Sequence, residues 1–249
     1  MSDKSRQHSA QSSKQRFATT HWSVVLAAGK RSSPQQKQAL ETLCRSYWFP
    51  LYAYLRQRGC DWHEAEDVTQ AFFAHMLEKE NLRTVDPQYG KFRSFLLVRL
   101  KGFLSDERDR ARAQKRGGGR KILSLGIQNA EGQYALEPAR GLSPEMLFEK
   151  SWALKVLERT MDRLEADMAK KGKQGLFDHL KVYLTADKDA IPYEAMAAEL
   201  RMTEGSVRVA VHRLRRRYKK LLRDEISQTV SDDDQIDEEM GHLFSALAY

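Results

Sequence analysis

The sequence predicts an all-α protein made of two helical domains joined by a flexible linker. Apolar residues recur at spacings of three and four, and no stretch of the 249 residues alternates with the period of two that a strand requires. Glycine and proline are scarce, at 14 and 6 residues, but six of the glycines lie within residues 117–143. Those residues show little periodicity and form the predicted linker between the domains.

Composition limits the class of protein further. The chain has 41% hydrophobic residues and only two cysteines, Cys44 and Cys60, so a disulfide framework is excluded. Its longest apolar run, residues 24–28, is far shorter than the roughly 20 residues that span a bilayer. Residues 1–16 are polar, are expected to be disordered and carry no visible secretory signal. We therefore expect a soluble, cytoplasmic protein that does not associate with membranes.

The predicted N-terminal domain covers residues 17–116 and contains a short helix over 20–29 and three long helices. The first long helix runs over about 35–58 and should be kinked by Pro50. Asp61 and Glu64 have the spacing of a capping box and start the second, and the third follows a turn that contains Pro87. The expected core residues are Leu40, Leu43, Tyr47, Leu51 and Tyr54 on the first helix, Ala65, Val68, Phe72 and Met76 on the second, and Phe92, Leu96, Leu100 and Phe103 on the third.

The predicted C-terminal domain covers residues 144–226 and starts at Ser143-Pro144-Glu145, a cap followed by a proline that helices favour in their first turn. Two helices separated by residues 201–203 end this domain, and an acidic tail follows at 227–249. The apolar stripe of its first helix is Leu147, Leu154, Leu157, Met161, Leu164 and Met168.

Charge gives the first indication of function. Lysine and arginine exceed aspartate and glutamate by 42 to 34, and two segments hold most of the excess. Residues 99–121 have nine basic and three acidic residues, and residues 201–223 have nine and one. Basic residues at this density favour a polyanionic partner, and nucleic acid is a better candidate than a membrane surface. The alternative is a pair of solvated helices.

Residues 192–220 have the spacing of a helix-turn-helix, whose second helix inserts into the major groove of DNA. Thr203 caps that helix and is itself a candidate DNA contact, and the first turns present the candidate base contacts Glu204, Ser206, Arg208 and Val209. The basic residues further along this helix are better suited to contact phosphates than bases. The remaining candidate DNA contacts on the open face are His212, Arg213, Arg216 and Arg217.

The sequence resembles the extracytoplasmic-function (ECF) sigma factors, specificity subunits of bacterial RNA polymerase. Residues 193–208 (YEAMAAELRMTEGSVR) are similar to the promoter-recognition domain of that family, called sigma4. Residues 61–73 (DWHEAEDVTQAFF) are similar to its polymerase-binding helix, and residues 92–104 (FRSFLLVRLKGFL) to its promoter-melting helix, both in the domain called sigma2. The resemblance covers about residues 17–226, with the motifs in the expected order.

The resemblance implies that the protein binds core RNA polymerase, recognises the −35 and −10 promoter elements and promotes transcription initiation. Glu66, Asp67 and Gln70 would contact a coiled coil of the largest polymerase subunit, on an acidic helix that suits a basic partner. Ala71 and Ala210 depart from the family, since relatives often have glutamate and a basic residue there. The implied contacts to the −10 element and the melted strand are Tyr89, Lys91, Phe92, Arg93, Arg99, Lys101, Arg108 and Arg112.

Other functions remain open on the sequence alone. A stand-alone helix-turn-helix regulator would need no acidic polymerase-binding helix, and a recombinase would need a mixed α/β catalytic domain that residues 17–116 do not predict. Cys60 and His63 lack the second ligand pair of a zinc site, so we expect no catalysis, metal or cofactor. An anti-sigma factor or another regulator would be a further partner.

The acidic tail also allows two interpretations. It either keeps the protein soluble, or it brings its acids to the basic face at 208–220 and docks an apolar face on a groove as a tethered DNA mimic. The residues of that apolar face are Met240, Leu243, Phe244 and Leu247.

Overall fold

The computed structural model describes residues 34–78, 91–113, 130–136, 141–186, 191–227, 229–230 and 233–248, and every regular element among them is a helix. The all-α fold class is confirmed for these residues. The helix predicted over 20–29 lies outside them. The elements are α2 (Pro34–Gln57), α3 (Trp62–Glu78), α4 (Phe92–Ala113), α5 (Ala130–Leu136), α6 (Pro144–Lys170), α7 (Gln174–Leu180), α8 (Val182–Thr185), α9 (Tyr193–Leu200), α10 (Glu204–Ile226), the 3₁₀ turn η2 (Asp233–Gln235) and α11 (Ile236–Leu247).

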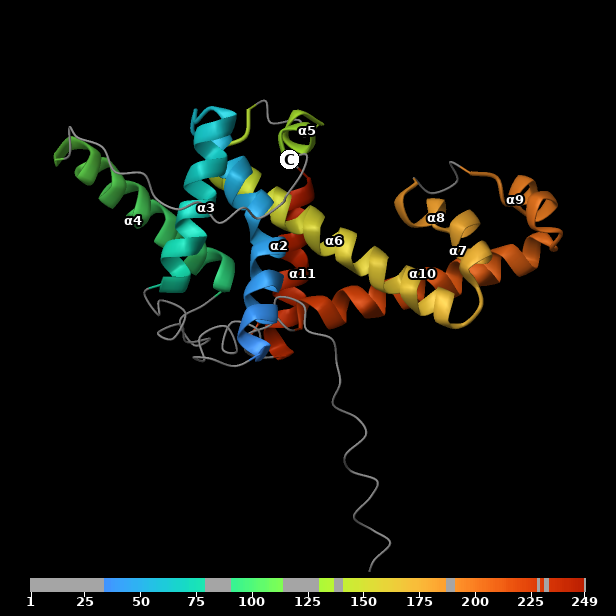
Figure 1. Cartoon of the computed structure of the whole chain (residues 1–249). Helices are drawn as coiled ribbons and strands as arrows, with labels where there is room; N and C mark the ends of the chain where they lie inside the picture. Colours follow the sequence, from blue (N-terminus) through green and yellow to red (C-terminus); the bar gives the residue numbers. More distant parts are fainter. Residues whose placement is uncertain are drawn as a thin grey trace, which may run out of the picture.

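At one end of the molecule, α2 packs on α6 and α3, and α11 packs on α6 (Figure 1). Helix α2 contains Pro50 and is followed by Gly59, whose φ of +92° favours a residue without a side chain. Asp61 then starts α3 by accepting a hydrogen bond from the backbone N–H of Glu64 at 2.8 Å, so the predicted cap is confirmed. The buried residues on α2, α3 and α4 include Leu43, Tyr47, Leu51, Tyr54, Ala65, Phe72, Met76, Phe92, Leu96, Leu100 and Phe103, as the periodicity predicts. Val68 is only half-buried, and the side chain of Leu40 lies outside the described part.

Helix α6 begins where the sequence places it and spans both ends of the molecule (Figure 1). The Ser143 hydroxyl accepts a hydrogen bond from the N–H of Met146 at 3.1 Å, and Pro144 occupies the first turn. Trp152 is buried against the helices around α2, whereas Leu164 is buried at the other end. Because α6 changes partners along its length, its inward face changes as well, and Leu154 of the predicted stripe is 38% exposed.

The buried side chains form two cores that share helices. The proximal core contains residues of α2 to α5, the first part of α6, the end of α10 and α11. The distal core contains Leu164 of α6, residues of α7 to α9 and the first part of α10. Both cores therefore include residues of α6 and α10. The sequence analysis, in contrast, assigns residues 144–226 to the second domain alone. The distal core residues are Leu164, Phe177, Leu180, Tyr183, Met196, Ala197, Val207, Val211, Leu214 and Leu221.

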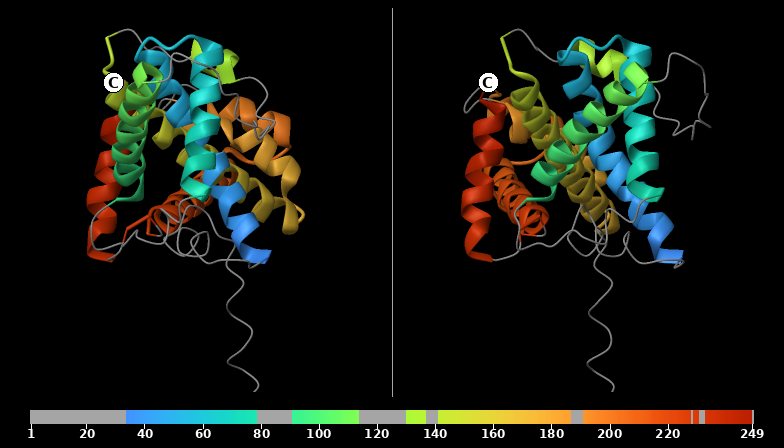
Figure 2. Two further views of the ribbon diagram at one scale, coloured as in Figure 1. Left: turned by 60° about the vertical axis from the view of Figure 1, so that its left-hand side comes forward. Right: turned by 90° about the vertical axis from the view of Figure 1, so that its left-hand side faces the viewer.

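Two segments that the sequence treats as peripheral pack on the proximal core. Within the predicted linker, α5 lies on α2, where Glu131 accepts hydrogen bonds from Arg56 at 2.8 and 3.0 Å and from the Tyr52 hydroxyl at 2.5 Å. Within the predicted tail, α11 packs along α6 (Figure 2), and its Glu239 contacts Lys91 and Arg93 at the start of α4. Its buried residues are Ile236, Glu239, Met240, Leu243 and Ala246.

Buried polar groups join the end of α10 to α6, and α6 to α2. Glu225 is 2% exposed and pairs with Arg163, while Arg159 donates a hydrogen bond to the Ser46 hydroxyl at 2.7 Å. Burial lowers the pKa of the Arg159 guanidinium against the opposing effect of Glu225. Breaking such buried contacts is costly, so α10 has a defined position on the proximal core.

Candidate functional site

The helix-turn-helix predicted from the sequence is formed by α9, a three-residue turn and α10. Arg201 ends α9 with a φ of +51°, the left-handed conformation that closes a helix, and the Met202 N–H then donates to the Ala197 carbonyl at 3.0 Å. Thr203 caps α10 by accepting a hydrogen bond from the Ser206 N–H at 3.2 Å. The small Ala197 is buried in the distal core against α10, as helices that cross closely require.

The open face of α10 presents the predicted DNA contacts to solvent. Val207, Val211 and Leu214 point into the distal core, and the residues between them point outward. Val209 is 49% exposed, which leaves an apolar side chain free to meet a thymine methyl group. The predicted contacts that are exposed are Thr203, Glu204, Ser206, Arg208, Val209, His212, Arg213 and Arg216.

Arg208 is oriented by two neighbours. Its guanidinium donates to the Glu204 carboxylate at 2.6 and 3.0 Å, one turn back along α10, and lies 4.6 Å from the centre of the Tyr193 ring on α9. These contacts hold the side chain at the start of the recognition helix, where it would enter a major groove. The Arg208–Glu204 pair is exposed, so it contributes little to stability.

Two further arginines of α10 have structural partners. Arg217 is half-buried and pairs with Asp167 of α6 at 2.9 Å, and Arg215 donates to the Tyr183 carbonyl at 2.9 and 3.2 Å. Burial would raise the pKa of the Asp167 carboxyl, but Lys171 and Arg217 outweigh it and the pKa is lowered. Arg215 and Arg217 therefore attach α10 to its neighbours, so Arg213 and Arg216 are better placed to contact phosphates.

The predicted polymerase-binding face of α3 is partly exposed. Asp67 is exposed and Glu66 half-buried, but Gln70 is 9% exposed and its amide nitrogen lies 3.4 Å from a Glu66 carboxylate oxygen. Gln70 is therefore packed beneath this face and exposes little of its side chain to a partner. Trp62, one turn before Glu66, is 48% exposed and was missed by the sequence reasoning, although an aromatic residue beside acids in the first turn of a helix is a signal for it.

Of the predicted contacts to the −10 element, Tyr89 and the side chain of Arg112 lie outside the described residues. Phe92 is 5% exposed, with its ring centre 5.5 Å from that of Tyr47, so it is a core residue with no free face for a base. Arg99, Lys101 and Arg108 are exposed on α4. Lys101 pairs with Glu145 of α6 at 2.8 Å, and the Arg99 guanidinium lies 5.2 Å from the centre of the Phe95 ring.

A cavity of about 290 Å³ lies between α3 and α4, beside these exposed basic residues. Phe72 and Phe103 line its inner wall, and Arg99 also lines it. Val98, another lining residue, is 68% exposed. An apolar hollow next to a cation is the kind of surface on which an unpaired base stacks.

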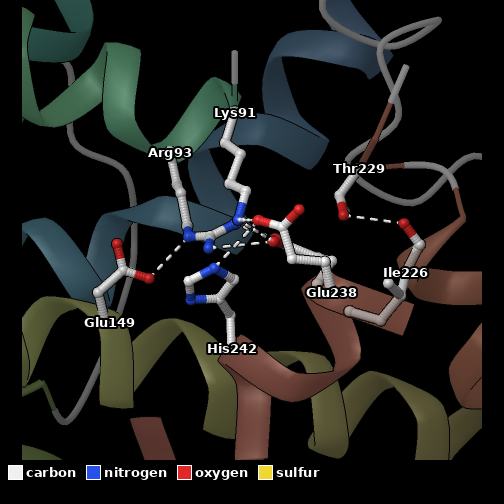
Figure 3. A network of polar contacts seen from close by, with 8 residues as sticks. Lys91, Arg93, Glu149, Ile226, Thr229, Glu238 and His242 are labelled. Carbon is white, nitrogen blue, oxygen red and sulfur yellow. Dashed lines mark hydrogen bonds and ion pairs between the residues drawn. The ribbon is translucent and has the colours of Figure 1, made fainter. Parts of the chain in front are cut away.

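Lys91 and Arg93, at the start of α4, are engaged by acidic residues from two other helices (Figure 3). Arg93 is 5% exposed, donates to Glu149 at 2.6 Å and pairs with Glu239 of α11. Its guanidinium also lies 4.1 Å from the centre of the Trp152 ring. Lys91 lies 2.7 Å from the same Glu239 carboxylate, so α11 occupies both cations.

Burial would raise the pKa of the Glu239 carboxyl, but Arg93 and Lys91 outweigh it and the pKa lies below its usual value. Burial likewise disfavours the Arg93 cation, and Glu149 and Glu239 outweigh it, so its pKa is raised. The sequence reasoning named Lys91 and Arg93 but missed Glu149 and Glu239. From charge, the sequence predicted that the tail acids approach the basic face at 208–220, whereas in the structure Asp237 pairs with Arg223, beyond that face, and Glu239 pairs with Lys91 and Arg93.

Neither a metal site nor a membrane span is present in the part of the chain that the structure describes. No three histidine, cysteine, aspartate or glutamate side chains gather there as metal ligands would. Each described helix is too short or too polar to cross a bilayer.

Comparison of the chain with protein-family models, with curated proteins and with solved structures gives no significant match.

Proposed function

We propose that the chain is an ECF-type RNA polymerase sigma factor, a cytoplasmic protein that binds core polymerase and recognises promoter DNA. The observation that carries this proposal is the capped helix α10, which presents Glu204, Ser206, Arg208 and Val209 on the exposed face of a helix-turn-helix. A recognition helix with these side chains in its first turns would contact bases in the major groove. Exposed arginines further along would contact the phosphates.

The exposed face of α3 supports the polymerase part of the proposal. Trp62 supplies a large apolar side chain, and Glu66 and Asp67 place negative charge beside it. An exposed aromatic residue next to charges of one sign suits a protein partner of the opposite charge. The same face would have no function in a protein that binds only DNA.

The exposed basic residues of α4 support the promoter-melting part. Arg99 and Arg108 provide positive charge, and the cavity beside Val98 and Phe103 provides an apolar surface. Melted DNA needs both, because its bases stack on apolar groups while its backbone is attracted to cations. Lys91 and Arg93 would join this surface only if Glu239 left them.

A stand-alone helix-turn-helix regulator is the second candidate, and one observation favours it. Lys91 and Arg93 are paired with acids, whereas Arg208, Arg213 and Arg216 of α10 are exposed. Such a regulator would bind its site through α10 without polymerase.

The two candidates are separated by measuring binding to genomic promoter fragments with and without core polymerase. A sigma factor is expected to join core polymerase in gel filtration and to bind promoter fragments specifically only in that complex. Specific binding by the isolated protein, with no association to core polymerase, would support the regulator instead. Asp67→Arg, which reverses the charge of the exposed face of α3, is expected to lose the association with core polymerase. Asp162→Arg is its matched control, since Asp162 is an exposed acid on α6.

A further inference from the structure

Helix α11 covers cations that the proposed function needs. Glu239 is 0% exposed and contacts both Lys91 and Arg93, and Glu238 lies 3.7 Å from Lys91. Figure 3 shows Lys91, Arg93 and Glu238 directed toward one another. A carboxylate held by a lysine and an arginine has the charge and the contacts that a phosphate group would have at the same place. The start of α4 is therefore an anion site whose occupant in this structure belongs to the chain itself.

We propose that α11 is an internal competitor for single-stranded nucleic acid, so that a melted strand binds at Lys91 and Arg93 only when Glu239 has left them. This inference rests on the proposed function, because that function gives the start of α4 to the melted strand. Strand and helix exclude each other, since both place negative charge on the same two cations. The protein then has a closed state, with α11 docked, and an open state that binds the strand.

The contacts around Arg93 make the open state accessible. If Glu239 leaves, Arg93 still has Glu149 at 2.6 Å and the Trp152 ring at 4.1 Å, so its buried charge keeps a partner. Lys91 is 27% exposed and becomes available to a ligand. The element that leaves, α11, follows every other helix that the structure describes.

The apolar face of α11 makes the closed state the favoured one. Ile236, Met240, Leu243 and Ala246 are buried in the proximal core, and undocking would expose them. The apparent affinity for the strand is reduced by the fraction of molecules that are open. A change that weakens docking should therefore tighten strand binding without adding a contact to the strand.

The test compares two variants that each remove one negative charge from the C-terminal segment. Glu239→Gln removes the buried carboxylate, and Asp233→Asn removes an exposed one in η2. Binding of a fluorescein-labelled single-stranded oligonucleotide is followed by anisotropy at low and moderate salt. We expect Glu239→Gln to bind at least tenfold more tightly than the wild type, and Asp233→Asn to stay within about twofold.

A second measurement uses the wild-type chain and does not depend on a variant that folds. Amide hydrogen exchange of residues 236–247 is compared without and with a saturating concentration of the oligonucleotide. Competition predicts faster exchange in α11 when the strand is bound. Unchanged exchange in the bound protein, or equal affinities of Glu239→Gln and Asp233→Asn, would overturn the inference.

Failure of this inference and failure of the proposed function give different results. If the wild type drives promoter-specific transcription while the two variants bind strands equally, the inference is wrong and the proposed function stands. If no polymerase preparation transcribes with the protein, but Glu239→Gln gains strand binding, the proposed function is wrong and the covered anion site stands.

Discussion

Glu239, in the last helix, is fully buried against Arg93, which lies 146 positions earlier in the chain near the start of α4. The contact joins the acidic C-terminal segment to the helix that the proposed function assigns to promoter melting. It also places a carboxylate of the chain between two basic residues, Lys91 and Arg93. The position of α11 thus bears on both the stability of the protein and its access to nucleic acid.

Replacement of Glu239 by glutamine should lower the free energy of unfolding by about 3 kcal/mol at neutral pH, because it leaves the buried Arg93 with one acidic partner fewer. The pKa of Glu239 is lower in the folded protein than in the unfolded chain. Its ionised form therefore stabilises the fold above the unfolded value of about 4.3, and this contribution is lost as the pH falls through the folded value. Urea unfolding at pH 7, 4 and 3 should show the difference between wild type and variant shrinking in acid. If the difference in unfolding free energy does not change with pH, Glu239 stabilises the fold through the packing of its side chain and not through its charge.

Replacement of Arg208 by alanine should weaken binding of cognate promoters by about 1–3 kcal/mol and relax one position of the −35 element, because this exposed guanidinium would contact a base. Replacement of Arg216, an exposed residue two turns further along α10, should weaken binding evenly across sequences, as loss of a phosphate contact does. Arg217 is a poorer control, since its removal also breaks the 2.9 Å pair with Asp167. Binding curves on a set of altered −35 elements check this, and identical behaviour of Arg208→Ala and Arg216→Ala would contradict it.

Replacement of Asp67 by arginine should reduce association with core polymerase at least tenfold, because it reverses the charge of the exposed face of α3. Trp62→Ala should reduce it as well, through loss of apolar contact area. Both residues are exposed, so thermal unfolding should change little. Co-purification with core polymerase measures the effect, and retention equal to that of Asp162→Arg would place the docking surface elsewhere.

The two cysteines should react with thiol reagents at very different rates. Burial, with a contribution from Glu41, raises the pKa of Cys44 to about 11, and its side chain is 5% exposed. Burial also raises the pKa of Cys60, which is half-exposed at the end of α2. At pH 8 we expect Cys60 to be labelled first and Cys44 only when the proximal core unfolds. Labelling of Cys60→Ser at a rate independent of denaturant would show that Cys44 is accessible in the folded protein.

Local sequence signals were sufficient for much of the fold. The caps at Asp61, Ser143 and Thr203 are formed as predicted, because each depends only on a side chain and the backbone three residues later. Helical periodicity likewise identified the buried face of α10, where every third or fourth residue enters one core.

The sequence did not predict which helix faces pack against one another. Glu238 and Glu239 pair with Lys91 and Arg93 and not with the basic face at 208–220, since docking of Met240 and Leu243 fixes where α11 lies. Phe92 has the residue type of a base-stacking platform, but a neighbouring aromatic residue, Tyr47, covers it. Such outcomes depend on contacts between residues far apart in the chain, which neither local spacing nor net charge determines.

Transcription in vitro by core RNA polymerase, with this protein as the added specificity subunit, tests the proposed function most directly. On fragments of the source genome we predict discrete transcripts that depend on the protein, that are lost with Asp67→Arg and that are reduced with Arg208→Ala. Asp162→Arg should transcribe like the wild type. The absence of any protein-dependent transcript, from a core polymerase that another sigma factor activates in the same assay, would contradict the proposed function.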